Sequence, residues 1–236
     1  MERKNFLKNG FTALGLVTVA PLMNACKKED VSSGSSTTTT TGGSSGNSSC
    51  TEAPTETQGP YPTKQPSAYV RSNIVDDRTG VPLAVNINIV NTNNSCTALA
   101  NAIVDIWHCD KDGNYSEYSS YTSVHFLRGR QVTDANGLVS FTSIFPGWYN
   151  GRATHIHVHI YNASGTSLKV TQIAFPEGSS SAVTVVNTTA YSKGMSGYTS
   201  NANDNVFGDG YSAELATVTG SVSAGYTLTH TIAVAG

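Results

Sequence analysis

Beyond its N-terminal segment this 236-residue chain has no cluster of basic residues, and its 14 Lys and Arg against 16 Asp and Glu leave a formal net charge of −2. Proteins that bind nucleic acid present a basic patch to the phosphates, so this charge distribution argues against a nucleic-acid partner. From residue 50 onward the chain also lacks any sustained 3.6-residue apolar period between helix caps. That absence argues against a mainly helical domain.

The first 26 residues have the pattern of an export signal. Arg3, Lys4 and Lys8 precede an apolar run, FTALGLVTVAPLMNA, that is too short to span a membrane as a mature helix. The run ends in LMNAC, which resembles a bacterial lipobox and predicts that Cys26 is acylated and becomes the mature N-terminus. The beginning, RKNFLK, is similar to a twin-arginine export signal with Lys in place of the second Arg. We therefore expect an exported protein that is lipid-anchored to the bacterial cell envelope, on the periplasmic side or at the cell surface.

Residues 27–49 lack the composition of a folded segment. They contain no large apolar residue after Val31 and are rich in Ser, Thr and Gly. Such a segment has nothing to bury in a core, so it predicts a disordered tether. The expected organisation is an export signal over 1–26, a tether over 27–49 and one folded domain over 50–236.

Cysteine is scarce, with four residues in the whole chain. If Cys26 carries the anchor, Cys50, Cys96 and Cys109 remain, which is an odd number in a compartment where disulfides persist. The simplest arrangement is one disulfide and one free thiol. We expect Cys50 to pair with Cys96, because Cys109 ends an apolar strand and suits the role of a small buried side chain.

The folded part is dominated by a period of two. In LAVNINIVN, apolar residues alternate with polar ones from Leu83 to Ile89, which predicts a half-buried strand. Asp, Asn and Gly clusters such as DKDGN and TDANG separate the strands. Residues 191–212 are expected to form a long irregular loop with room for one short helix. The prediction is an all-β fold, an antiparallel β-sandwich with long active-site loops. Further strands, rich in β-branched and aromatic residues, are expected at 101–109, 137–145, 154–161, 167–175, 181–187 and 226–235.

The stretch THIHVHIY places three histidines at alternate positions of a predicted strand. His155, His157 and His159 would share one face, and the apolar residues between them the other. Three imidazoles on one face next to Arg152 favour a metal site over three separate hydrogen-bonded histidines. Imidazole suits zinc, copper, iron and nickel alike, so the histidines alone leave the metal open. One hypothesis is a copper or zinc site that uses all three, and another is a lipid-anchored, non-catalytic β-sandwich that binds a carbohydrate or a periplasmic partner.

Four segments taken together resemble the intradiol ring-cleavage dioxygenases, and most closely the small extracytoplasmic branch related to protocatechuate 3,4-dioxygenase. The resemblance covers nearly all of residues 50–178 in the family's order and becomes weak beyond DNVFGDG. It implies a β-sandwich that holds one mononuclear Fe(III) ion per chain. The four segments are TETQGPYPT (55–63), VDIWHCDKDGNYSEY (104–118), FLRGRQVTDANGLVSFTSIFPGWYNGRATHIHVHI (126–160) and VTQIAFPEG (170–178).

The resemblance implies two tyrosinate and two histidine ligands for this iron. Residue by residue they are Tyr115 in DGNY, Tyr149 in PGWY, and His155 and His157 in RATHIH. In the family Tyr149 and His157 would be the axial pair. Phenolates are hard anionic donors that stabilise Fe(III) over Fe(II). The position of His159 is commonly not histidine in the family, so this residue is expected to be either a hydrogen-bond partner beside the site or merely the next residue on that face, and not a ligand.

The implied reaction cleaves a catechol-type ring with O2, incorporates both oxygen atoms and gives a cis,cis-muconate-type dicarboxylic acid. Tyr149 would leave the metal and take one catechol proton. Arg152 matches the arginine that stabilises charge on the substrate ring, Gln172 matches a glutamine beside the site, and Tyr61 a position near the substrate mouth. Asp105 is expected to support a ligand. Only two residues separate Tyr149 from Arg152, where protocatechuate enzymes have more, and no helical dimerisation domain precedes the site, so the particular catechol and the oligomeric state stay open.

Overall fold

The computed structural model describes residues 50–236. The predicted export signal over 1–26, with its acylated Cys26, and the predicted tether over 27–49 lie outside these residues and stay predictions. Among the described residues no helix is both long enough and apolar enough to cross a bilayer.

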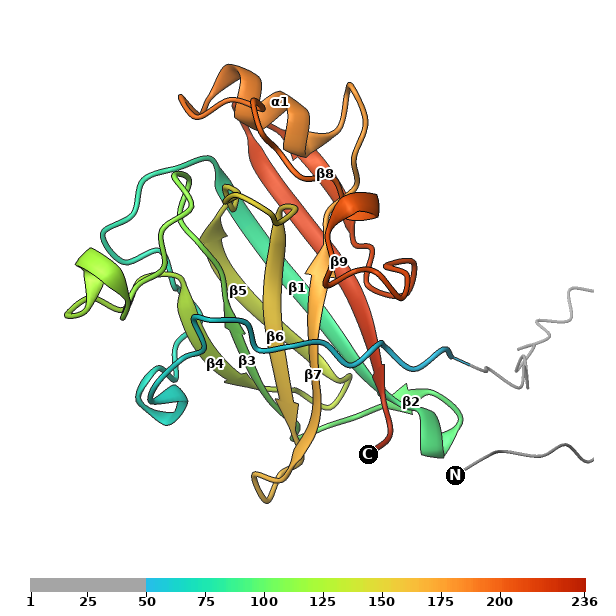
Figure 1. Ribbon diagram of the computed structural model, residues 1–236. Coiled ribbons are helices and arrows are strands. Elements are labelled where there is room, and N and C mark those ends of the chain that lie inside the picture. Colours follow the sequence, from blue (N-terminus) through green and yellow to red (C-terminus); the bar gives the residue numbers. More distant parts are fainter. Residues whose placement is uncertain (1–49) are drawn as a thin grey trace, which may run out of the picture. The chain divides into compact units, whose positions relative to one another are not determined.

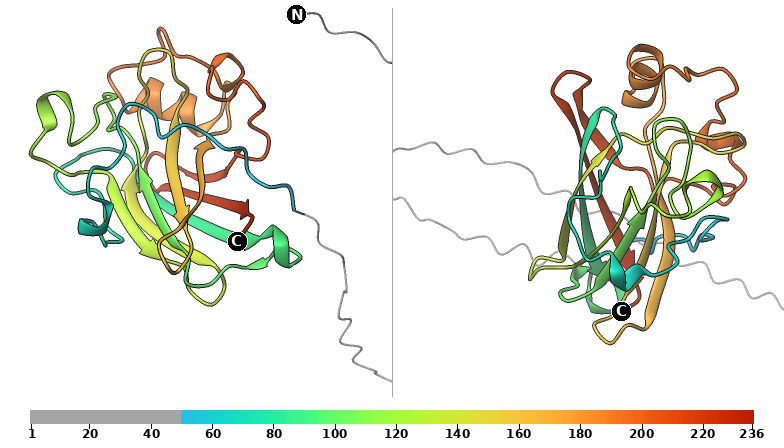
Figure 2. Two further views of the ribbon diagram at one scale, coloured as in Figure 1. Left: turned by 60° about the horizontal axis from the view of Figure 1, so that its bottom comes forward. Right: turned by 90° about the vertical axis from the view of Figure 1, so that its left-hand side faces the viewer.

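Two β-sheets face each other and form a sandwich (Figures 1 and 2). Among the named strands the pairing is antiparallel except between β1 and β9, which run parallel, so the predicted mostly antiparallel β-sandwich is confirmed. One sheet contains β1 (Pro82–Asn91), β2 (Thr97–Ala98), β5 (Leu138–Ile144), β8 (Thr217–Ser221) and β9 (Gly225–Val234), and the other contains β3 (Ile103–Trp107), β4 (Arg128–Val132), β6 (His155–Tyr161) and β7 (Ser167–Ala174) in the order β4-β3-β6-β7.

Alternation along β6 fixes which face of the second sheet carries the polar residues. Ile156, Val158 and Ile160 are fully buried in the core between the sheets, together with apolar residues of β1, β5 and β9. Successive residues of a strand point to opposite faces, so the three histidines of β6 lie on the face turned away from that core. The register places Trp107 and Gln172 opposite His157 on the same face.

Residues 50–64, which we call the strap, cross this outer face (Figure 1). The Glu56 N–H donates to the Val170 carbonyl of β7 at 2.9 Å, and the Gln172 amide donates to the Thr57 carbonyl at 3.0 Å. The strap is also tied down by a disulfide between Cys50 and Cys96, whose Cα atoms are 5.8 Å apart, as the sequence predicts. The polar face is therefore covered by chain rather than open to solvent.

Cys109 is the free cysteine among residues 50–236, and it is buried. Burial is the main cause that raises the pKa of its thiol to about 12. The thiol is therefore protonated at neutral pH and acts as a small apolar side chain, in agreement with its predicted role.

The predicted strand at 181–187 is wrong, because this segment forms helix α1 (Ala182–Thr189). Its run of β-branched residues favours a strand, but Ser181 caps the helix by accepting a hydrogen bond from the Thr184 N–H. Val183, Val186 and Asn187 are buried at the spacing of one helix face. The other helices are single 3₁₀ turns, η1 (Pro66–Ala68), η2 (Thr92–Asn94), η3 (Ser119–Tyr121) and η4 (Asn201–Asn203), and η4 is the short helix expected within the loop 191–212.

Candidate functional site

The structure brings all seven residues of the predicted site into one cluster on the outer face of the β4-β3-β6-β7 sheet. β6 supplies the histidines and β7 supplies Gln172, while loops at the same end of the sandwich and the strap supply the rest. Residues from five separate segments therefore meet at one place. They are Tyr61, Tyr115, Tyr149, Arg152, His155, His157 and Gln172.

The two histidines face each other through their Nε2 atoms, which are 3.1 Å apart. His155 Nδ1 lies 2.6 Å from the Ala153 carbonyl, and because a carbonyl can only accept, Nδ1 carries the proton. The lone pair of His155 is then on Nε2 and points into the cluster. Burial is the main cause that lowers the pKa of His155 to about 3 and the pKa of His157 well below its usual value. Both imidazoles are neutral at physiological pH and can donate lone pairs.

Two phenols complete the group. The Tyr115 hydroxyl lies 3.3 Å from His155 Nε2, and the Tyr149 ring packs edge-on against both Tyr115 and His155, with centroids 5.7 Å apart in each pair. Burial raises the pKa of both phenols, most strongly that of Tyr115. Arg152 opposes this shift but does not overcome it. Ionisation of the phenols therefore needs a further positive charge at this place.

The distances between these donor atoms fit one metal ion. Ligand atoms that each lie about 2.1 Å from an ion, at angles of about 90–109°, are about 3.0–3.4 Å from one another. The observed separations of 3.1 Å between the two imidazole nitrogens and 3.3 Å between Tyr115 and His155 lie in this range. Two neutral imidazoles, the buried phenol of Tyr115 and the half-buried phenol of Tyr149 form a donor set that a cation would satisfy.

The third histidine of the strand does not join the others. His159 hydrogen-bonds through Nε2 with the Ser167 hydroxyl and through Nδ1 with the Tyr161 hydroxyl, each at 2.8 Å. Among residues 50–236 no group of three or more His, Cys, Asp or Glu side chains is arranged to hold a metal ion. The three-histidine copper or zinc site is therefore not formed, and a metal at this place would need the tyrosines.

Arg152 is held beside the phenols by two side chains. Its Nε donates to both carboxylate oxygens of Asp204, at 2.9 and 2.8 Å, and its Nη2 donates to the Gln172 carbonyl oxygen. Nη1 lies 3.5 Å from the Tyr149 hydroxyl. The guanidinium is thus fixed with one nitrogen directed at the candidate site.

Sequence reasoning missed Asp204 as a site residue. It is buried within the loop 191–212 and also accepts a hydrogen bond from the Ala153 N–H at 2.8 Å. The only signal in the sequence was the length of that loop, which suggested that it serves a site. Asp105 does not support a ligand as expected, because its carboxylate binds Arg130 at 2.5 and 2.7 Å.

The strap closes the site from the outside. The Tyr61 ring stacks on the Tyr115 ring with centroids 4.8 Å apart. Gly59 has a φ of +69°, and a Cβ at this position would lie 3.1 Å from His157 Cε1. Glycine therefore allows both the left-handed backbone and the close approach of the strap to the imidazole. Beneath it, the His157 ring stacks on Trp107 with centroids 4.9 Å apart.

Comparison with known proteins gives consistent matches. A family model described as "Dioxygenase" matches residues 54–215. Chlorocatechol 1,2-dioxygenase of Rhodococcus opacus is 33% identical over 101 residues, which cover 34% of this chain and 39% of that protein. Catechol 1,2-dioxygenase 2 of Acinetobacter lwoffii is 35% identical over 92 residues, 32% of this chain and 34% of that protein. The match thus spans little more than a third of the length of these curated relatives.

A solved structure matches over a larger share of both chains. The intradiol ring-cleavage dioxygenase from Tetranychus urticae is 33% identical, with a TM-score of 0.69, and the match covers 78% of this chain and 95% of that one. The similarity therefore includes both the sandwich and the loops that carry the candidate site.

Proposed function

This chain belongs to the family of intradiol ring-cleavage dioxygenases, and from that premise we propose that it is a non-haem Fe(III) enzyme that cleaves a catechol-type ring with O2. The cut would fall between the two hydroxyl-bearing carbons and give a cis,cis-muconate-type dicarboxylic acid. The observation that carries the proposal is that His155 Nε2 lies 3.3 Å from the Tyr115 oxygen and 3.1 Å from His157 Nε2, with Tyr149 alongside.

In this proposal Tyr115, Tyr149, His155 and His157 hold the iron. Two phenolates favour Fe(III), because hard anionic oxygens stabilise the higher charge. When bound, the ion would supply Lewis-acid activation of the two catechol oxygens. It would also supply the positive charge that the buried phenols lack, and so lower their raised pKa values.

Tyr149 is the residue that we assign as the base for one catechol proton. Its side chain is less buried than that of Tyr115, whose ring is stacked against the Tyr61 ring. The Tyr149 oxygen can therefore turn toward the substrate and accept a proton, while Tyr115 stays in place. The Arg152 nitrogen 3.5 Å from the Tyr149 oxygen would stabilise the phenolate before that transfer.

Arg152 has a second task in this proposal, since negative charge builds up on the catechol ring as the reaction proceeds. A guanidinium held by Asp204 and Gln172 needs no reorganisation to meet that charge, and such fixed charges contribute most to catalysis. Tyr61, stacked on Tyr115 at the strap, would contact the substrate as it enters. The expected partners are a small-molecule catechol and O2.

The site of action is proposed from the sequence. The lipobox-like LMNAC and the basic start of the chain support export and a lipid anchor at Cys26 on the cell envelope. In that arrangement the catalytic domain would meet catechols outside the cytoplasm.

Oxygen uptake by the iron-loaded protein across a panel of catechols tests the proposal. We expect one O2 consumed per catechol and a dicarboxylic acid product that contains both oxygen atoms. Arg152→Gln is expected to slow the reaction by about 100-fold or more, as loss of a charge-stabilising donor does in other enzymes. A protein that binds catechols without consuming O2 would instead be a binding module.

A further inference from the structure

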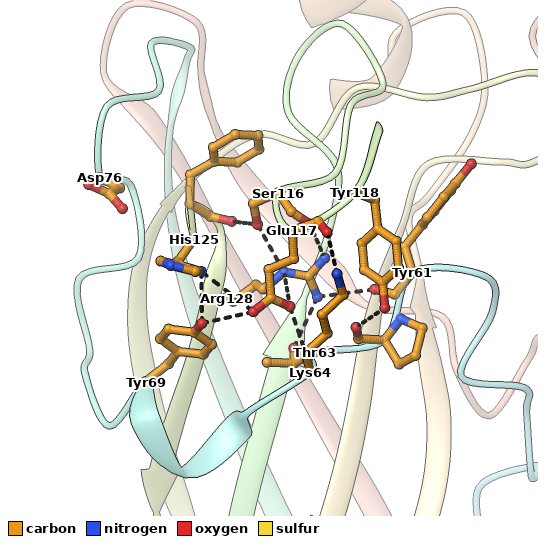
Figure 3. A network of polar contacts seen from close by, with 12 residues as sticks. Tyr61, Thr63, Lys64, Tyr69, Asp76, Ser116, Glu117, Tyr118, His125 and Arg128 are labelled. Atoms are coloured by element: carbon orange, nitrogen blue, oxygen red, sulfur yellow. Dashed lines mark hydrogen bonds and ion pairs between the residues drawn. The ribbon is translucent and has the colours of Figure 1, made fainter. Parts of the chain in front are cut away.

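A second polar network lies beside the candidate site, between the strap and the loop that follows β3 (Figure 3). At its centre is Arg128, the first residue of β4, whose side chain is only 1% exposed. In the sheet register Arg128 lies opposite Trp107, and Trp107 lies opposite His157. Residues paired across strands point to the same face, so the guanidinium approaches the site from the β4 side.

The Arg128 guanidinium binds two chain segments that are far apart in the sequence. Nη1 donates to the Tyr61 carbonyl at 3.0 Å and to the Thr63 hydroxyl at 3.1 Å. Nη2 donates to the Ser116 carbonyl at 2.6 Å, and Nε donates to the Ser116 hydroxyl at 2.9 Å. Tyr61 and Ser116 both lie outside helices and strands, so their carbonyls have no ladder partners. The planar guanidinium, with donors on all three nitrogens, joins the two segments.

Glu117 balances the charge of Arg128. Its carboxylate lies 3.3 Å from the Arg128 Nε, and it accepts hydrogen bonds from the Lys64 N–H at 2.9 Å and the Tyr69 hydroxyl at 2.8 Å. Glu117 is 2% exposed, so a buried charge pair with complete hydrogen bonding spans the strap and the loop. The carboxylate oxygens have their partners within the protein, and the network therefore fixes geometry rather than binding a ligand.

Two aromatic rings of the candidate site depend on the segments that Arg128 joins. Ser116 directly follows Tyr115, and Tyr61 stacks on the Tyr115 ring at 4.8 Å. Fixing the Tyr61 and Ser116 carbonyls fixes the two rings against each other and the Tyr115 oxygen against His155. We propose that Arg128 is a positioning residue for Tyr115 and Tyr61. The inference rests on the proposed function for the meaning of that position, but the position itself can be tested without metal.

The test compares Arg128→Lys with Arg130→Lys in metal-free protein. Lysine keeps the charge but has a single ammonium group in place of the planar set of N–H donors, so it cannot hold both segments in the same geometry. Arg130, two residues along β4, is the matched control, because its guanidinium binds Asp105 and contacts neither segment. Tyrosines carrying ¹³C-labelled rings are observed by NMR, with signals assigned from Tyr61→Phe and Tyr115→Phe. We expect Arg128→Lys to shift both signals and Arg130→Lys to leave them unchanged. Unshifted signals in Arg128→Lys, or equal shifts in both variants, would overturn the proposal.

Iron binding provides the second readout. Arg128→Lys is expected to bind iron about 10- to 100-fold more weakly, as loss of an outer partner of a ligand does, and to shift the tyrosinate-to-Fe(III) absorption band. Arg130→Lys is expected to match the wild type. A wild type that binds no iron would contradict the proposed function, while the tyrosine spectra would still decide the role of Arg128. Normal iron binding with an unshifted band in Arg128→Lys would overturn the inference alone.

Smaller changes keep the test decisive if Arg128→Lys does not fold. Ser116→Ala and Thr63→Val each remove one acceptor of Arg128 and leave the ion pair with Glu117 in place. The first is expected to shift the Tyr115 signal and the second the Tyr61 signal. If neither signal moves, Arg128 does not position the rings.

Discussion

The orientation of the Arg152 side chain is set by two neighbouring side chains, Asp204 and Gln172. Two of its three nitrogens are occupied, Nε by Asp204 and Nη2 by Gln172, so only Nη1 is left for Tyr149 and the substrate. The Asp204 carboxylate is itself held by the Ala153 and Val206 N–H groups, at 2.8 and 3.0 Å. The orientation of Arg152 is therefore set before any substrate arrives.

Asp204→Asn tests this arrangement. The change leaves Arg152 as a buried charge without a counter-ion, so we expect the free energy of unfolding to fall by about 3 kcal/mol or more, measured by urea denaturation. We expect kcat to fall while the iron content stays at the wild-type level, because Asp204 contacts none of the four proposed ligands. The double variant Asp204→Asn with Arg152→Gln removes both charges and should be less destabilised than the sum of the two single variants. Additive losses would show that the pair is not coupled.

The buried His108 ring makes the stability of the protein depend on pH. The ring bonds the Cys109 carbonyl and the Ser143 hydroxyl, and burial lowers its pKa to about 4. Between the unfolded value of about 6.5 and this value the unfolded state binds the extra proton, so stability falls as pH decreases. We expect this one residue to remove about 3 kcal/mol between pH 6.5 and pH 4. The check is urea unfolding of wild type and His108→Asn over this pH range. If the free energy of unfolding falls equally with pH in both proteins, the expectation is contradicted.

At the residue scale, the motifs of the sequence named the side chains that meet in the cluster, since the tyrosines and histidines stand at fixed places in recognisable segments. Asp204 and Arg128 could not be found this way. Asp204 bonds Arg152, 52 positions away, and Arg128 bonds the Tyr61 carbonyl, 67 positions away, and neither stands in a pattern of apolar period or ligand spacing. Their roles follow only from the folded arrangement of loops.

At the scale of elements, the alternation of β6 does most to build the site. It commits Ile156, Val158 and Ile160 to the core and so commits the histidines to the outer face. On that face the His155 and His157 rings meet at their Nε2 atoms, whereas the His159 ring bonds the Ser167 and Tyr161 hydroxyls instead. The strap then covers this face and brings Tyr61 over Tyr115.

The disulfide is expected to hold the start of the strap in place. Cys50 and Cys96 are 46 residues apart, and the chain-entropy model gives about 4 kcal/mol for closing a loop of this length. The double variant Cys50→Ser with Cys96→Ser should lose up to that amount in urea unfolding and should exchange the strap's amide hydrogens faster. Dithiothreitol should destabilise the wild type but not the double variant. If dithiothreitol destabilises the wild type and the double variant equally, its effect does not come from reduction of the Cys50–Cys96 disulfide.

Two of the elements that the sequence did not predict, β4 and α1, share a physical reason. β4 reads RGRQV, with two arginines and a glycine, and has no apolar alternation because its role is to present Arg128 and Arg130. Helix α1 carries three valines that favour a strand in isolation, but its cap and the burial of one face decide otherwise. In both cases contacts made after folding outweigh the local preference.

At the scale of the whole molecule, the two sheets provide a rigid frame and the loops at one end provide the chemistry. Strands β6 and β7 contribute His155, His157 and Gln172, and the loops contribute Tyr115, Tyr149, Arg152 and Asp204. Such a site is formed only when the complete sandwich has folded.

Visible absorption of the purified protein during an anaerobic titration with catechol tests the central claim most directly. Two tyrosinate ligands to Fe(III) predict a coloured protein whose charge-transfer band shifts when catechol is added. Tyr115→Phe should weaken the colour, and His157→Ala should lose the iron. A colourless protein that contains zinc or copper at full occupancy would contradict the account.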